Sequence, residues 1–127
     1  MNDTLRFKYL RIALVLVGVT FIAGIYLLMI VWPSGWAWHA GAPYESDYFM
    51  MIVGVYATLG VFLILASRNP AANRSLILFT IVSSLVHAAI MAVQSFQMPE
   101  HMGHLYGDVP GLIAVAVVLY LLRPAEA

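Results

Sequence analysis

The sequence of 127 residues is 63% hydrophobic and only 9% charged, with a mean hydropathy of +0.91. An average soluble domain is roughly a quarter charged, and a small domain buries only about two-thirds of its chain surface. This composition therefore predicts lipid as the solvent. A formal net charge of zero gives no electrostatic attraction to nucleic acid. The lack of cysteine excludes disulfides, thiolate metal sites and cysteine nucleophiles.

Four segments are long and apolar enough to cross a bilayer, which takes about 20 residues per helix. The predicted spans cover about residues 12–32, 48–66, 75–96 and 106–122. The first segment exceeds the roughly 7–15 apolar residues of a signal peptide, so we expect it to be retained. The last is cleanly apolar only from Val109 to Leu122, about 21 Å of helix at ~1.5 Å per residue. It crosses only if Leu105 to Asp108 also enters the membrane or the bilayer thins.

The basic residues all fall on one side of these predicted spans. They are Arg6, Lys8, Arg11, Arg68, Arg74 and Arg123. The positive-inside rule then places both termini in the cytoplasm. Short connections make consecutive helices antiparallel neighbours, so the predicted fold is all-α, a single transmembrane up-down four-helix bundle. Four glycines are expected to allow close helix approach: Gly18, Gly24, Gly54 and Gly60.

A polar layer at one depth is the main candidate site. Counting about 1.5 Å per residue from the cytoplasmic arginines brings one polar residue of each span to a similar height. These residues are Tyr26, Tyr56, His87 and Asp108. In the third span, polar residues recur every three or four positions, so their stripe should face the interior. The stripe consists of Ser83, Ser84, His87, Met91 and Gln94. The predicted cofactor-binding residues are His87, Tyr56, Asp108, Tyr26 and Gln94.

His87 has both a functional and a structural interpretation. An ionisable residue inside a membrane is costly and is by default a functional candidate. It could ligate a metal or haem, relay a proton or bind a polar head group, with Asp108 as the partner that orients its ring. Alternatively, His87 is structural and satisfied by one tyrosine hydroxyl or one backbone carbonyl, and Asp108 before Pro110 is the N-cap of the fourth helix.

A second candidate is a metal site in the outer loops. Its predicted ligands are His101, His104, Met98, Met102 and His39. Histidines three residues apart share one face of a turn, and thioethers suit Cu(I) better than Zn(II). The alternative is that these are ordinary polar and packing residues near the head groups.

No phosphate-binding loop, dinucleotide fingerprint, metalloprotease motif or nucleophile elbow occurs in the chain. The sequence therefore favours a non-enzymatic protein, an accessory subunit of a membrane complex or a homo-oligomer. The alternative is a ligand-binding or redox protein that holds haem, copper, a quinone or a lipid head group at the layer of His87, Tyr56 and Asp108. Acid–base catalysis by His87 and Asp108 has the least support.

Several stretches resemble an uncharacterised family of small bacterial four-helix membrane proteins. The resemblance rests on Gly35 to His39, Tyr48 to Pro70, Ser83 to His87 with Gln94, and His101 to Asp108. More distantly, the architecture is similar to that of the DoxX-like group. The resemblance implies a bacterial inner-membrane location and the same bundle fold, and it implies no reaction.

Overall fold

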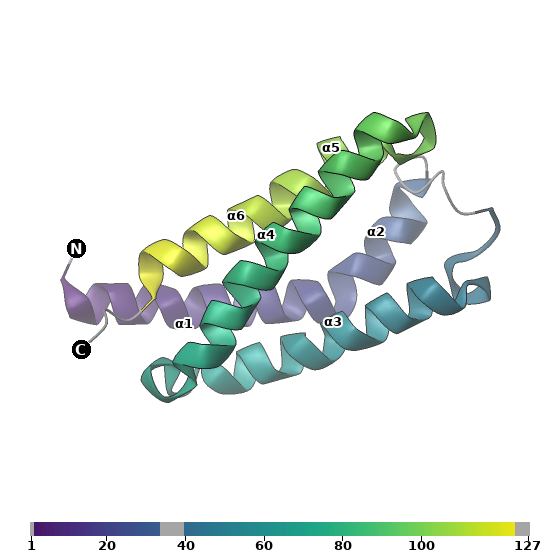
Figure 1. Ribbon diagram of the computed structural model, residues 1–127. Coiled ribbons are helices and arrows are strands. Elements are labelled where there is room, and N and C mark those ends of the chain that lie inside the picture. The colour runs from purple at the N-terminus through teal and green to yellow at the C-terminus, as the bar shows by residue number, and fades with distance from the viewer. Residues whose placement is uncertain (1, 34–39, 124–127) are drawn as a thin grey trace.

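A computed structural model describes residues 2–33 and 40–123, and within these ranges the chain is helical with no strands. Figure 1 shows the long helices. The first helical segment comprises α1 (Asp3–Val19), η1 (Thr20–Gly24) and α2 (Ile25–Val31). The second comprises η3 (Pro43–Glu45) and α3 (Asp47–Ala66), and the third η4 (Pro70–Asn73) and α4 (Arg74–Gln97). The fourth comprises η5 (Pro99–His101), α5 (Gly103–Tyr106) and α6 (Asp108–Leu122).

The predicted all-α class with four membrane-length helices is confirmed. The helical segments Asp3–Val31, Asp47–Ala66, Pro70–Gln97 and Pro99–Leu122 are long and apolar enough to cross a membrane. Only 17–28% of the most apolar window of each is buried within the protein, which leaves most of each helix surface for lipid. The described helices therefore expose most of their apolar surface, which requires a hydrocarbon solvent.

The first helix begins well before its apolar stretch. Asn2 is the N-cap, because its side-chain oxygen accepts a hydrogen bond of 3.1 Å from the backbone N–H of Thr4. The second long helix is capped in the same way at Ser46, whose hydroxyl accepts from the N–H of Phe49. These caps, rather than hydropathy, determine where the hydrogen-bonded helices start.

The helices pack as two pairs. α1 packs along α3, α4 packs along α6, and contact between α1 and α6 joins the pairs. α3 and α4 are consecutive, but they diverge from η4 and contact each other little. Figure 1 shows the start of α1, the end of α6 and η4 at one end of the molecule. The buried centre near this end includes Leu10, Leu14, Leu63 and Leu119.

A π-helical turn bends the first span. In η1 the Thr20 hydroxyl donates a hydrogen bond of 2.9 Å to the carbonyl oxygen of Leu16. Beyond this turn, the axis of α2 departs from that of α1 (Figure 1). A π turn holds one extra residue, so later side chains are rotated relative to a continuous α-helix. The bend separates α2 from α1 and frees space between the spans.

Two of the four predicted small-residue contacts are present. A β-carbon on Gly18 would lie 2.6 Å from the carbonyl oxygen of Gly60, so this pair brings α1 and α3 into backbone contact. Gly24 lies beside Thr20 of its own helix, and a β-carbon on Gly54 would meet no atom within 4 Å. The close-approach prediction is right for Gly18 and Gly60, and wrong within the described chain for Gly24 and Gly54.

Candidate functional site

A cavity of about 200 Å³ lies between the four spans, and its lining is almost entirely apolar. Its polar side chains, Thr20, Tyr56, His87 and Asp108, come one from each span, so the fold rather than one segment assembles the site. The lining residues from the first two spans are Thr20, Phe21, Ile25, Leu28, Ile52 and Tyr56. Those from the last two are His87, Met91, Gly107, Asp108, Gly111, Leu112 and Val115.

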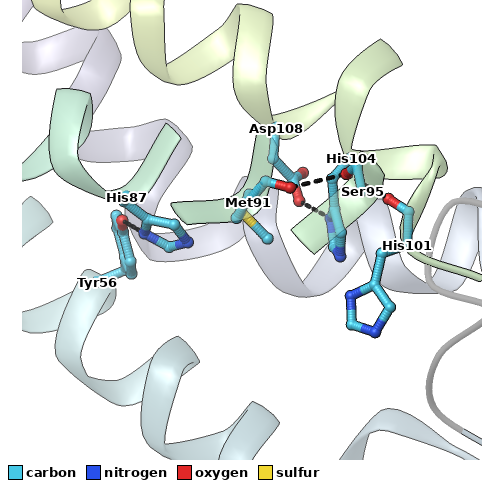
Figure 2. Close-up of polar contacts among 7 residues, drawn as sticks. All are labelled: Tyr56, His87, Met91, Ser95, His101, His104 and Asp108. Carbon is cyan, nitrogen blue, oxygen red and sulfur yellow. Dashed lines mark hydrogen bonds and ion pairs between the residues drawn. The ribbon is translucent and has the colours of Figure 1, made fainter. Parts of the chain in front are cut away.

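His87 is hydrogen-bonded to Tyr56, and both side chains line the cavity. The hydroxyl of Tyr56 on α3 is hydrogen-bonded to Nδ1 of His87 on α4, as Figure 2 shows. Phe21, within the π-helical turn, packs edge-on against the Tyr56 ring at a centroid distance of 4.8 Å and an interplanar angle of 89°. The π turn, α3 and α4 therefore meet at one polar contact, which fixes the orientation of the imidazole.

Asp108 is paired with a different histidine. Nδ1 of His104 lies 2.5 Å from Oδ2 of Asp108 (Figure 2). The His104 side chain is only 2% exposed and the Asp108 side chain 13%. The pair bridges the helix break at Gly107, one helical turn apart in sequence. A charge so far from water requires such a partner, because an unpaired buried carboxylate is costly.

The outer end of α4 is tied to the segment after it. The buried Ser95 hydroxyl lies 2.8 Å from the carbonyl of Met91 and 2.7 Å from that of His101 (Figure 2). The His101 and His104 rings are neighbours, with centroids 5.7 Å apart. Ser95 thus anchors the short η5–α5 segment that supports His104.

The predicted polar layer is correct in part. Tyr56, His87 and Asp108 come from three spans and line the same cavity. Tyr26 does not line it; its neighbour Ile25 does, because the extra residue of the π turn rotates the side chains of α2 about the helix axis. The expectation that Gln94 faces the interior is wrong, since Gln94 is exposed.

Two predictions about Asp108 are also corrected. Its carboxylate is bonded to His104 rather than to His87, whose hydrogen-bond partner is Tyr56. Asp108 is the first residue of α6 and makes no side-chain capping bond, and the N-cap is Gly107. Pro110 fits because the first N–H groups of a helix have no partner within it.

Of the predicted outer metal ligands, His101 and His104 lie next to each other, with ring centroids 5.7 Å apart. Within residues 2–33 and 40–123, no three His, Asp or Glu side chains are placed to hold a metal ion. His104 is buried against Asp108, whereas Met98 is 37% exposed. His39 lies outside the described residues.

Sequence reasoning missed Ser95 and the π turn. Ser95 lies eleven residues, about three helical turns, after Ser84, and both are buried on α4, so the spacing contained that signal. At the outer end of the predicted stripe, Ser95 is buried and Gln94 is exposed. The π turn has no comparable sequence signal in Thr20–Gly24.

The four apolar helical segments around a small cavity define a multi-pass integral membrane protein. Within that class, the chain belongs to a family of unknown function, DUF6632, whose sequence model matches residues 4–127. No curated protein and no solved structure gives a significant match to the chain.

Proposed function

We propose that this protein binds a small, neutral, single-ring ligand within the bilayer, with His87 as the principal polar contact. The observation that carries the proposal is the cavity itself. It is apolar over nearly all its surface, yet it is also lined by His87 and Asp108, which come from different helices. Ligand sites in proteins have this composition, an apolar lining with a few polar groups that orient the ligand.

The cavity volume limits the size of the ligand. About 200 Å³ slightly exceeds the apolar cavity of about 150 Å³ that binds benzene. It is below the roughly 300 Å³ at which pockets for drug-sized ligands begin. Of the ligands considered from the sequence, a quinone head group is a single ring and suits this volume. A haem macrocycle is far too large.

Charge argues against a lipid phosphate. No Lys or Arg is among the described residues that line the cavity, and Asp108 would repel an anion there. A neutral ring avoids this repulsion and needs only one or two hydrogen bonds. Its alkyl substituents would be accommodated by lining residues such as Leu28, Ile52 and Val115.

The role of accessory subunit or homo-oligomer is the competing proposal, and it requires no occupant in the cavity. The membrane location is also part of the proposal. The six Lys and Arg residues, and the resemblance to small bacterial membrane proteins, support an inner-membrane protein with cytoplasmic termini. A reporter fused after Ala127 should be active only in the cytoplasm, and periplasmic activity would refute this orientation.

The binding test uses two matched glycines. A β-carbon on Gly111 or on Gly54 would meet no atom within 4 Å, but only Gly111 lines the cavity. Replacing Gly111 with Leu should therefore place a side chain in the cavity, whereas Gly54→Leu should leave the cavity open. Both changes remove a helical glycine, which is unfavourable by about 1 kcal/mol relative to alanine, so neither should unfold the helix.

The measurement is calorimetric titration of p-cresol into the protein in lipid nanodiscs, corrected with empty nanodiscs. The proposal predicts one saturable site per chain in the wild type and in Gly54→Leu, and none in Gly111→Leu. Protoporphyrin IX should not bind at this site. Equal uptake by empty nanodiscs, wild type and Gly111→Leu would refute the binding function and leave the accessory role.

A further inference from the structure

The hydrogen bond between Tyr56 and His87 determines what the imidazole offers to the cavity. A tyrosine hydroxyl has one hydrogen, and the described chain gives that of Tyr56 no acceptor other than Nδ1 of His87. Tyr56 therefore donates, and Nδ1 accepts. In the neutral imidazole the proton is then on Nε2. No described residue is hydrogen-bonded to Nε2, so His87 presents a donor to the cavity that it lines.

Asp108 presents a hydrogen-bond acceptor to the cavity, whereas His87 presents a donor. One carboxyl oxygen, Oδ2, is taken by His104 at 2.5 Å. Whichever of these two groups carries the shared proton, the other oxygen of Asp108 remains an acceptor. No described residue donates to that oxygen, and Asp108 lines the same cavity as His87. His87 and Asp108 thus present one donor and one acceptor to the cavity, whereas the hydroxyls of Thr20 and Tyr56, which also line it, are hydrogen-bonded to Leu16 and His87.

We propose that the ligand is an aromatic ring bearing a hydroxyl group, a phenol or hydroquinone, and that the site discriminates against the quinone of the same ring. This inference rests on the proposed binding function and specifies its ligand class. A hydroxyl group accepts a hydrogen bond from Nε2 of His87 and donates one to Asp108. It satisfies both the donor of His87 and the acceptor of Asp108.

A quinone satisfies only one of them. Its carbonyl oxygens accept from Nε2 of His87, but the ring has no hydrogen to donate to Asp108. Binding a quinone would take the carboxyl oxygen out of contact with water without giving it a partner. A site that hydrogen-bonds a hydroxyl rejects analogues lacking it, because its own polar group is left unpaired.

The test compares methylhydroquinone with methyl-1,4-benzoquinone, which differ by two hydrogen atoms. The chain has no cysteine for the quinone to alkylate. Anaerobic calorimetric titrations in nanodiscs should give an affinity about tenfold higher for the hydroquinone in the wild type, the effect of one hydrogen bond to a charged group. Gly111→Leu should bind neither compound.

Two variants separate the roles of the polar groups. In Asp108→Asn the amide oxygen can accept from His104, which leaves an NH₂ donor for the cavity, so the preference for hydroquinone should fall to about unity or reverse. In His87→Phe both affinities should fall by a similar factor, with the preference retained. Circular dichroism and the elution volume in detergent check that each variant is folded.

The possible failures are distinguishable. If neither compound binds the wild type saturably, the proposed binding function and this inference both fail. If both bind with equal affinity, or the quinone binds more tightly, the cavity binds rings but the hydroxyl specificity is refuted. A preference unchanged in folded Asp108→Asn would also refute it, because Asp108 would then not recognise the hydroxyl.

Discussion

Gly18 and Gly60 bring the backbones of α1 and α3 into direct contact. A β-carbon on Gly60 would lie 2.5 Å from the carbonyl oxygen of Gly18, and one on Gly18 would lie 2.6 Å from that of Gly60. In a bilayer, where lipid is as apolar as leucine, close packing of this kind is a main source of helix association. The contact precedes the π turn directly and positions it against α3.

Substituting Ala at Gly60 should therefore destabilise the fold. The methyl group would overlap backbone atoms, which cannot move aside as a flexible side chain can. Overpacking of this kind costs about 1–3 kcal/mol. The measurement is unfolding in mixed micelles with increasing SDS, followed by circular dichroism. Gly54→Ala is the matched control on the same helix and should be neutral or slightly stabilising, because its β-carbon meets open space. Equal stability of the two variants would contradict the close contact.

Substituting Phe at Tyr56 should weaken ligand binding without unfolding the protein. The ring would still pack edge-on against Phe21, but Nδ1 of His87 would lose its donor. The imidazole would then be free to exchange tautomers, and part of the population would present an acceptor to the cavity. We expect several-fold weaker p-cresol binding, together with a change in the ¹⁵N chemical shifts of His87 toward a tautomer mixture. An unchanged ¹⁵N spectrum would show that Tyr56 does not position His87.

The sequence was sufficient to predict the four spans because hydropathy reports directly on contact with lipid. It also brought Tyr56, His87 and Asp108 to one depth, since helical rise is nearly constant. The fourth span was predicted to need either Leu105 to Asp108 or a thinner bilayer, and Leu105 to Asp108 lie within the helical segment Pro99–Leu122. The depth of a side chain along its helix can thus be predicted from the sequence, whereas the direction in which it faces around the helix axis is harder to predict.

The errors arose where a helix departs from regular geometry or where two residues satisfy the same spacing. The depth count assumed a continuous α-helix through Thr20–Gly24, and the extra residue there changes the facing of Tyr26 by about 100°. Gln94 and Ser95 both lie at helical spacing after Met91. Ser95 occupies the buried position because its short hydroxyl can bond the carbonyl of Met91 within its own helix.

Substituting Ala at Ser95 should loosen the segment after α4. The change removes the hydrogen bond to the carbonyl of His101 and leaves that buried acceptor without this donor. A lost hydrogen bond of this type costs about 1 kcal/mol. Hydrogen–deuterium exchange should rise in η5 and α5, including the amide of Met102, which donates to Pro99. Ser83→Ala is the control, because among the described residues the Ser83 hydroxyl bonds only the Thr80 carbonyl of its own helix. Equal exchange in both variants would refute the anchoring role of Ser95.

Substituting Ala at Gly107 should displace Trp32. A β-carbon on Gly107 would lie 2.5 Å from Cζ3 of the Trp32 indole, so the ring would have to move away from the helix break. Because Gly107 also lines the cavity, this movement would change the cavity wall beside Asp108. In a background where Trp36 and Trp38 are replaced by Phe, the emission of Trp32 should shift in Gly107→Ala. It should remain unchanged in Gly111→Ala, whose β-carbon meets no atom within 4 Å. If both variants emit at the wild-type wavelength, Trp32 does not pack on Gly107, and the contact between the first span and the break between α5 and α6 is refuted.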